Sequence, residues 1–234
     1  MPEAILTDIE GTISSINFVK EILFPYSEER LSDYLIANYE RDHRVLKIID
    51  DVLAIENNEA GVVFEAQIYT AIEILLTWIK EDRKIAPLKE LQGLIWEEGF
   101  RKGLFKSHLY ADAYDWLLEV KGKGLPIYVY SSGSVFAQKL FFEHSEYGDI
   151  RYLFSGFYDT KIGSKKDADS YLKIAADIKV KPEYILFLSD IEEECAASEQ
   201  AGFLTVKVDR ESKEQNFSET RKIIHNFKEL ETYI

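Results

Sequence analysis

The sequence predicts an α/β fold built on a parallel sheet, with an all-helical insertion placed directly after the first strand. From about residue 110 onward, short apolar runs alternate with segments of helical periodicity, which is typical of β-α-β units. Residues 28–101 show helical periodicity and no convincing strand. One further apolar run, at residues 4–7, precedes this helical block. Since that run has the composition of a buried strand, we expect it to join the sheet from the far end of the sequence.

The length of the chain fits this organisation. At 234 residues, the chain suits one domain that carries a smaller insertion. We expect residues 1–15 and 106–234 to form the α/β core, and residues 16–105 to form the helical insertion. An insertion after the first strand is expected above the carboxyl edge of the sheet, where it can close over a site and exclude water.

The helical block is expected to begin soon after the first strand. Hydrophobic residues recur at helical spacing over residues 18–23, and Pro25 is expected to end or kink this segment. Asparagine and glycine at residues 57–61 predict a break between two helices. The other helical stretches of the block are expected over residues 31–36, 45–53, 68–79 and 91–96.

The remaining elements alternate between helix and strand, as a parallel sheet requires. Apolar periodicity and turn residues define their bounds. In order, they are a helix over 113–120, a strand over 126–130, a helix over 135–143, a strand near 157–159, a helix over 168–178, a strand over 184–188, a helix over 192–200, a strand over 204–208, a polar loop over 211–215 and a final helix over 219–230.

Charge and cysteine content exclude several classes of partner. The 28 basic and 42 acidic residues give a formal net charge of −14, which disfavours nucleic acid and anionic membranes as partners. An anionic substrate would need a locally positive site. The single cysteine, Cys195, is expected to be a small buried helix residue, and a lone cysteine fits a reducing compartment. We see neither a signal peptide nor an apolar run of membrane-spanning length, so we expect a cytoplasmic protein.

Two carboxylates at the end of the first strand are the first candidate site residues. Asp8 ends the apolar run, at the place where open α/β sheets bind their ligands. Glu10 follows two positions later, so both side chains can point into one crevice. One carboxylate can attack as a nucleophile while the other moves a proton. By itself, the pattern fits a solvated turn equally well.

Three hydroxyl and amine groups follow later strands. Ser131 and Ser132 open the hydroxyl-rich turn at residues 131–134, between a strand and a helix. Serine hydroxyls and free N–H groups at a helix amino end suit a phosphate, although taken alone the turn favours simple helix capping by serine. Lys165 could pair with phosphate oxygens or with the Asp8 carboxylate, but the adjacent Lys166 leaves the choice between the two lysines open.

The last candidate lies at the end of a later strand. Asp190 beside Asp8 would provide paired oxygen ligands for Mg²⁺, while the alternative is a helix cap. Glu194 lies four residues further on, where a solvated helix face is favoured over metal ligation.

The order of these motifs resembles a known superfamily. Asp-x-Glu-Gly-Thr, strand-Ser, Lys and strand-Asp follow one another as in the haloacid dehalogenase-like phosphohydrolases, which implies a Rossmann-like core with a helical cap. Within the superfamily, the chain resembles the enolase-phosphatases of methionine salvage from Ile5 to about Val208. The matching segments are residues 8–12, 18–20, 23–26, 91–93, 130–135, 137–140 and 186–190.

The resemblance implies a metal-dependent mechanism. One Mg²⁺ per chain would be held by Asp8 and Asp190, with Glu10 beside it and the Glu10 backbone carbonyl a candidate ligand. Asp8 would attack phosphorus and form an aspartyl-phosphate, and Glu10 would protonate the leaving oxygen and later activate water. The base of the enolisation step stays open among Glu10, a residue of the insertion and a metal-bound hydroxide.

The resemblance also implies the substrate, 2,3-diketo-5-methylthiopentyl-1-phosphate, contacted by Ser131, Ser132 and Lys165. The products would be phosphate and the acireductone 1,2-dihydroxy-3-keto-5-methylthiopentene. A monomer is implied as well.

Two departures and three alternatives accompany this interpretation. Glu194 stands where many members of the superfamily carry Asp, and residues 209–212 differ from the Arg-Pro-Gly-Asn type of loop. The chain could instead be a relative that acts on another small phosphate monoester, a metal-binding regulatory domain of receiver type, or a catalytically inactive interaction protein. The Glu10 and Ser131–Val135 signature favours the enolase-phosphatase.

Overall fold

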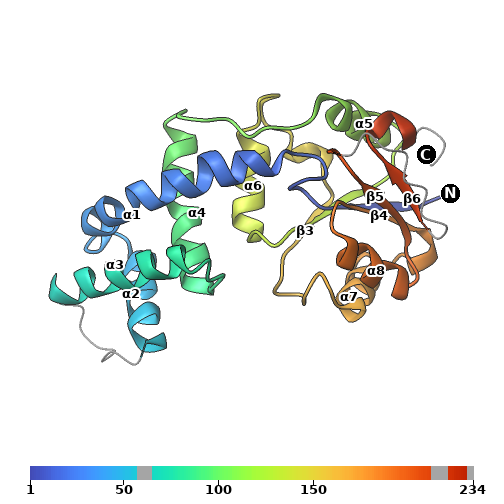
Figure 1. Cartoon of the computed structure of the whole chain (residues 1–234). Helices are drawn as coiled ribbons and strands as arrows, with labels where there is room; N and C mark the ends of the chain where they lie inside the picture. The colour runs from blue at the N-terminus through green and yellow to red at the C-terminus, as the bar shows by residue number, and fades with distance from the viewer. Residues whose placement is uncertain (57–64, 212–220, 231–234) are drawn as a thin grey trace. The chain divides into compact units, whose positions relative to one another are not determined.

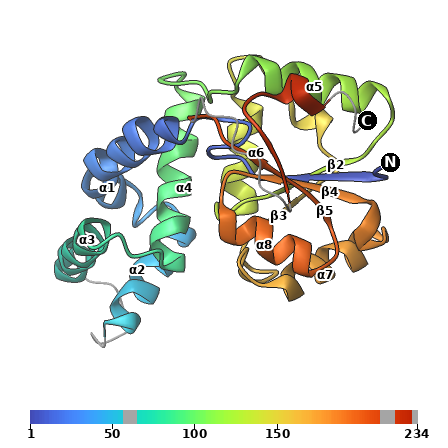
Figure 2. The same cartoon turned by 45° about the vertical axis from the view of Figure 1, so that its right-hand side comes forward.

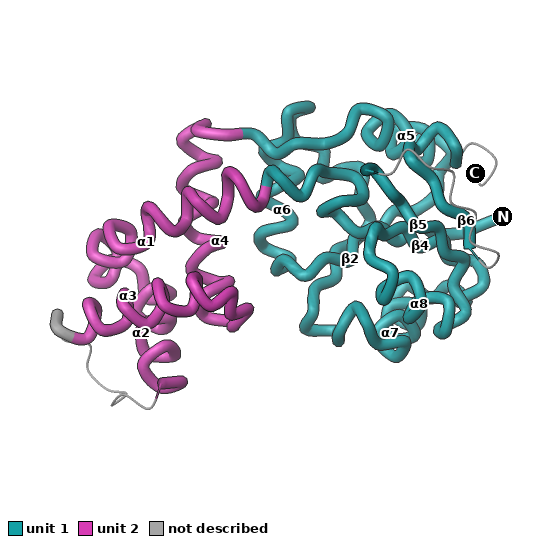
Figure 3. The backbone as a smooth tube through the Cα atoms, viewed as in Figure 1, with its two compact units in different colours: residues 1–18, 106–234 teal, residues 19–105 magenta. Residues whose placement is uncertain are grey.

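A computed structural model of the chain describes residues 1–56, 65–211 and 221–230 (Figure 1). The chain divides into two compact units, residues 1–18 with 106–234, and residues 19–105 (Figure 3). The expected break at residues 57–61 lies outside the described residues, as does the expected polar loop beyond residue 211. Among the described helices, none combines the length and the apolar character that crossing a membrane requires.

The first unit contains a six-stranded parallel sheet, which confirms the predicted α/β class. Its order is β3-β2-β1-β4-β5-β6. The first strand of the sequence therefore lies at the centre, between β2 and β4, and the strand order reverses there. Open α/β sheets bind ligands at such a reversal point. The strands are β1 (Ala4–Thr7), β2 (Ile127–Tyr130), β3 (Gly156–Tyr158), β4 (Ile185–Ser189), β5 (Leu204–Val208) and β6 (Lys222–Ile224).

Helices cover both faces of this sheet. α5 (Ala111–Gly122) lies on one face, while α7 (Ala168–Ile178) and α8 (Glu192–Gln200) lie on the other (Figure 2). Strands covered on both faces are apolar along their whole length, which explains the continuous apolar runs that predicted them. On the α7 and α8 face, Tyr130, Tyr171 and Phe187 are fully buried, and the burial of Phe187 contributes about 1.5–3 kcal/mol.

The end of the chain corrects one prediction. The helix expected over residues 219–230 is wrong, because β6 (Lys222–Ile224) pairs with β5 and a short 3-10 helix, η4 (Phe227–Leu230), follows it. Ile224, Phe227 and Leu230 recur at helical spacing, yet the three side chains are buried from a strand and a turn. Phe227 packs against Trp116 of α5 with ring centroids 5.2 Å apart.

The other core elements agree closely with the sequence pattern. α7, α8, β5 and α6 (Val135–Glu143) have the expected bounds. Capping side chains fix two of these starts: Ser134 accepts a hydrogen bond from the Ala137 N–H, and Asp167 accepts one from the Asp169 N–H.

Over its described residues, 19–56 and 65–105, the second unit consists of helices joined by turns and contains no strand, as the sequence predicted. Leu31, Ile49, Leu75 and Leu91, one from each of its four α-helices, belong to a common buried cluster. Pro25 does not end the first helical segment. It lies in the first turn of α1, where proline loses no hydrogen bond, directly after a π-helix. The elements are η1 (Phe18–Leu23), α1 (Phe24–Asn38), α2 (His43–Ile55), α3 (Glu65–Lys80) and α4 (Ala86–Arg101).

Candidate active site

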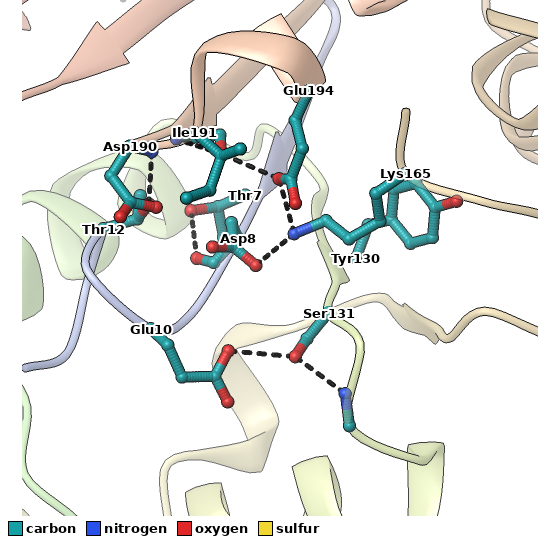
Figure 4. Close-up of polar contacts among 12 residues, drawn as sticks. Thr7, Asp8, Glu10, Thr12, Tyr130, Ser131, Lys165, Asp190, Ile191 and Glu194 are labelled. Carbon is teal, nitrogen blue, oxygen red and sulfur yellow. Dashed lines mark hydrogen bonds and ion pairs between the residues drawn. The ribbon is translucent and has the colours of Figure 1, made fainter. Parts of the chain in front are cut away.

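The carboxyl ends of β1 and β4 bring the two aspartates to the same edge of the sheet. Thr7 is in register with Leu188, and the Asp8 N–H donates to the Leu188 carbonyl at 2.9 Å. Asp8 follows β1 directly, and Asp190 follows β4 directly. Figure 4 shows the two side chains together with those of Glu10, Ser131, Lys165 and Glu194.

The turn after β1 is shaped to hold Asp190. Gly11 has a φ of +80°, and a Cβ atom built on it would lie 2.2 Å from Oδ2 of Asp190. Glycine is therefore needed both for its backbone conformation and for the close approach. The Asp190 N–H donates to Oγ1 of Thr12 at 3.1 Å. Because Ile191 occupies the N-cap position of α8, the alternative of Asp190 as a helix cap is wrong.

Lys165 is the buried lysine of the pair that the sequence left open. Its side chain is 6% exposed and its ammonium pairs with the Asp8 carboxylate, whereas the Lys166 side chain is 62% exposed. The ammonium also lies 2.7 Å from Oε2 of Glu194. Glu194 is buried and accepts a hydrogen bond from Oγ of Ser189 at 2.8 Å. The expectation of a solvated Glu194 is therefore wrong, since this side chain packs toward the sheet edge.

Two tyrosines that the sequence analysis did not select hold the Lys165 loop. The Tyr171 hydroxyl donates to the Lys165 carbonyl at 2.7 Å, and the Tyr130 hydroxyl donates to the Gly163 carbonyl at 3.0 Å. The ammonium of Lys165 lies 5.7 Å from the centroid of the Tyr130 ring, within the range of a cation–π contact. In the sequence, both tyrosines look like ordinary core aromatics, so only their hydroxyl groups could have signalled this role.

Ser131 contacts Glu10. Its hydroxyl donates to Oε2 of Glu10 at 3.1 Å and accepts from the Gly133 N–H at 3.2 Å. Ser132, the next residue, is exposed. Gln138 holds the turn at residues 131–134 in place, because its Nε2 atom donates a hydrogen bond to the Gly133 carbonyl at 2.8 Å. The structure thus brings Ser131 to the same edge as Asp8 and Glu10, with its hydroxyl directed at a carboxylate.

The amino end of α6 differs from the expectation of free N–H groups. The Val135 N–H donates to Oδ2 of Asp159 at 3.1 Å, and the Ala137 N–H donates to the capping hydroxyl of Ser134 at 3.2 Å. Together with Gly133, these residues use their N–H groups inside the protein. The capping alternative is therefore correct for Ser134.

Burial and the charge of Asp8 raise the pKa values of three neighbouring acids. Burial, followed by the charge of Asp8, raises the pKa of Glu10 to about 7 and that of Asp190 to about 6. The same two causes raise the pKa of Glu194 to about 7. For Lys165, burial works against the charged form, but the charges of Asp8 and Glu194 outweigh it and raise the pKa. The site therefore holds an excess of negative charge around one ammonium.

This excess, and the chemistry of the donors, fit a hard divalent cation. Asp8 and Asp190 offer carboxylate oxygens, which Mg²⁺ prefers. Among the described residues, no group of three or more histidine, cysteine, aspartate or glutamate side chains is arranged to hold a metal. A cation here would thus take one or two carboxylates and complete its shell with other oxygens, which is the ordinary binding mode of Mg²⁺.

Comparisons with known proteins agree with this geometry. A family model for haloacid dehalogenase-like hydrolases matches residues 2–202. The enolase-phosphatase E1 of Aquifex aeolicus is 51% identical over 231 residues, covering 99% of this chain and 100% of the relative. The enolase-phosphatase E1 of Persephonella marina is 51% identical over 210 residues, covering 90% of this chain and 89% of the relative.

Solved structures show the same similarity. The UTR4 protein of Saccharomyces cerevisiae has a TM-score of 0.76 and 30% identity, covering 98% of this chain and 100% of that one. CbbY of Rhodobacter sphaeroides, solved in complex with phosphate, has a TM-score of 0.60 at 16% identity, covering 99% of this chain and 97% of that one. At that identity, the likeness to CbbY concerns the fold alone.

Proposed function

The chain belongs to the haloacid dehalogenase-like hydrolases and, within them, to the enolase-phosphatase E1 family, and we propose its reaction from this membership. The proposed enzyme converts 2,3-diketo-5-methylthiopentyl-1-phosphate to the acireductone 1,2-dihydroxy-3-keto-5-methylthiopentene and phosphate. The observation that carries this proposal is the pairing of Asp8 with the buried Lys165 at the edge where β1 and β4 end. This pair puts an attacking carboxylate beside a fixed positive charge, which is what phosphoryl transfer requires.

Asp8 and Glu10 divide the phosphatase work. A carboxylate oxygen of Asp8 attacks phosphorus, the bond from phosphorus to the substrate oxygen breaks, and an aspartyl-phosphate forms. Glu10 donates a proton to the departing oxygen and then takes one from the water that hydrolyses the aspartyl-phosphate. Its pKa of about 7 supports both directions of transfer near neutral pH. Ser131, through its hydrogen bond to Glu10, orients this carboxyl group.

Lys165 and Ser132 are proposed to contact the transferred phosphoryl group. The Lys165 ammonium is held by Asp8 and Glu194, so it would meet the phosphate oxygens without a large rearrangement. Ser132 is exposed next to Ser131, where its hydroxyl can reach a bound substrate. We propose that the Ser131 hydroxyl, at the same edge of the sheet, also contacts the substrate.

The proposed cofactor is one Mg²⁺ per chain, held by the carboxylates of Asp8 and Asp190 and the backbone carbonyl of Glu10. Such an ion would polarise a substrate carbonyl and neutralise phosphate charge. The close approach of Gly11 to the Asp190 carboxylate and the hydrogen bond from the Asp190 N–H to Thr12 support this assignment, because they fix the position of Asp190.

The helical insertion is proposed to be the cap of the enzyme, comprising residues 16–105 by the sequence analysis, with residues 1–15 and 106–234 as the catalytic core. Closure of such a cap would exclude water from the reacting groups. We further propose a monomeric, cytoplasmic enzyme, for which the single buried cysteine is suited to a reducing compartment.

The phosphorylated diketone tests the proposal directly. The purified protein is incubated with this compound, with and without Mg²⁺, while phosphate release and the ultraviolet band of the conjugated enediol are followed. Both signals are expected, and both should require Mg²⁺. Phosphate release without an enediol signal would indicate a phosphatase for another small monoester and would overturn the enolase part. A folded protein that gives neither signal would overturn the whole assignment.

A further inference from the structure

Arg210 is an arginine with a largely buried side chain, close to the site, that the proposed mechanism does not use. It lies two residues beyond the end of β5, in the loop where the sequence departs from the family pattern, and its side chain is 10% exposed. Its Nε and Nη2 atoms donate to the Thr12 carbonyl at 3.1 and 3.0 Å, and its Nη1 atom donates to Oδ2 of Asp112 at 2.7 Å. The guanidinium thus donates three hydrogen bonds to two residues, Thr12 and Asp112, that are far apart in the sequence.

Two aromatic rings fix the guanidinium in this position. Its Cζ atom lies 4.2 Å from the ring centroid of Tyr110 and 4.9 Å from that of Phe227. Asp112 accepts a second hydrogen bond at the same Oδ2 atom, from the Phe227 N–H at 2.7 Å. The planar, always charged guanidinium suits such a place, because it can stack on rings while its fork of donors stays occupied. Arg210 therefore ties together the turn after β1, the start of α5 and η4.

The residue that Arg210 clamps is also the residue that holds Asp190. Thr12 presents its carbonyl to Arg210 and its hydroxyl to the Asp190 backbone N–H. The neighbouring Gly11 lies so close to the Asp190 carboxylate that a Cβ atom there would overlap it. A shift of the Gly11–Thr12 turn would therefore displace the carboxylate.

We propose that Arg210 is a positioning residue that clamps the Thr12 carbonyl and thereby holds the Asp190 carboxylate in the geometry that binds Mg²⁺. This inference rests on the proposed function, since it assigns Asp190 to the metal. It predicts that the loss of Arg210 weakens metal binding more than it slows the metal-saturated enzyme, because Arg210 contacts neither the nucleophile nor the proton donor.

A matched control is available in the same unit. The Arg221 side chain is 7% exposed and makes ion pairs with Glu199 and Glu192, at 2.5 and 2.7 Å. It is as buried and as fully bonded as Arg210, but its partners belong to α8 rather than to the Thr12 turn. Arg210→Met and Arg221→Met therefore both remove an arginine with a largely buried side chain, but only Arg210→Met releases Thr12.

The test measures Mg²⁺ binding in two ways. The first quantity is the concentration of Mg²⁺ alone that produces a fixed rise in the Tm of the full-length protein. The second is the Mg²⁺ concentration that gives half-maximal phosphate release. Arg210→Met is expected to raise both concentrations roughly tenfold or more, as the loss of a group that orients a metal ligand does. Its kcat at saturating Mg²⁺ should stay near that of the wild type. Arg221→Met should lower the metal-free Tm and leave both Mg²⁺ concentrations unchanged.

Each other outcome has a definite meaning. A lowered Tm with an unchanged Mg²⁺ requirement in Arg210→Met would overturn the proposal, because Arg210 would then act on stability alone. If Arg210→Met does not fold, Arg210→Lys is judged by the same two concentrations, since a single ammonium cannot reproduce the fork. A wild-type protein whose Tm does not respond to Mg²⁺ and which releases no phosphate would instead contradict the proposed function, before any variant is compared.

Discussion

At the scale of single residues, the site is a small group of charges that the fold has removed from water. Lys165 is 6% exposed and lies between two acids, Asp8 and Glu194. Removing one partner of a buried ion pair leaves the other uncompensated, which costs about 3–5 kcal/mol of stability. The lysine therefore serves both the stability of the site and its chemistry.

The two neighbouring lysines give a sharp prediction at this scale. Lys165→Ala is expected to lower kcat by roughly 10²–10³-fold, as the loss of a group that stabilises transition-state charge does. Lys166→Ala should resemble the wild type, because the Lys166 side chain is 62% exposed and the substitution removes an ion pair with Glu193, at 3.5 Å, on the surface. Phosphate release and the free energy of unfolding are measured for both variants. A larger loss of activity in Lys166→Ala would show that the geometric choice between the lysines is wrong.

The buried thiol gives a pH-dependent prediction. Burial raises the pKa of Cys195 from 9.0 to about 12. Because the folded-state pKa is raised, the resulting stabilisation is complete below the unfolded pKa and is lost as the pH rises through the folded one. The free energy of unfolding of wild type should therefore fall more steeply between pH 9 and 12 than that of Cys195→Ala.

The same residue should be chemically inert in the folded protein. A thiol reagent at pH 8 should label Cys195 only after unfolding, since the thiolate is the reactive form. Cys195→Ala should keep its turnover. Rapid labelling of the native protein would contradict this picture of the thiol.

At the scale of elements, sequence patterns predicted which residues end a strand but missed burial that depends on a distant partner. Asp8 was identifiable because an apolar run ends at it. The burial of Glu194 was not identifiable, because it depends on the ammonium of Lys165, which a distant part of the chain supplies. Local patterns report which residues begin and end an element, whereas a partner brought by tertiary folding leaves no local trace.

The prediction of a helix over residues 219–230 failed for a related reason. Ile224, Phe227 and Leu230 have the spacing of an amphipathic helix, and spacing was the signal used. A strand that pairs with β5 and a following 3-10 turn bury the same three side chains. α7 and α8 were predicted to the residue; Asp167 caps the start of α7, whereas α8 begins without a side-chain cap.

Gly11 allows a matched prediction about this turn. Both Gly11 and Gly124 have a φ of +80°, but a Cβ atom at Gly124 would meet nothing within 4 Å. Each substitution by alanine incurs the left-handed backbone cost of about 1–2 kcal/mol. Gly11→Ala adds the overlap with Asp190, so it should destabilise more and raise the Mg²⁺ requirement, while Gly124→Ala should leave that requirement alone. Equal Mg²⁺ requirements in the two variants would show that the Gly11 turn does not seat Asp190.

At the scale of the whole molecule, the first strand of the sequence lies at the centre of the sheet. β1 pairs with β2 and β4, although the helical unit of residues 19–105 separates it in sequence from both. The sequence pattern predicted that this run joins the sheet, whereas its central position became visible only from the pairing of the strands. The consequence is chemical: the two central strands deliver Asp8 and Asp190 to one edge.

The charge of the whole chain gives a prediction about metal binding. The formal net charge is −14, and buried acids with raised pKa values are gathered at the site. Mg²⁺ should therefore raise the Tm, with a stabilisation of about 2.7 kcal/mol at a hundred times its dissociation constant. Sodium chloride at equal ionic strength should do less, and Asp190→Asn should abolish most of the difference. An equal response to both salts would mean that Mg²⁺ merely screens surface charge.

The central claim is that Asp8 is the nucleophile of the phosphatase step, and trapping the covalent intermediate tests it most directly. Substrate labelled with ³²P at the phosphate is mixed with enzyme and Mg²⁺, the reaction is stopped in acid within one turnover, and the labelled peptide is mapped. We predict protein-bound label on Asp8 that hydroxylamine releases, and no bound label in Asp8→Asn. Label on a different residue, or full turnover by Asp8→Asn, would contradict the account.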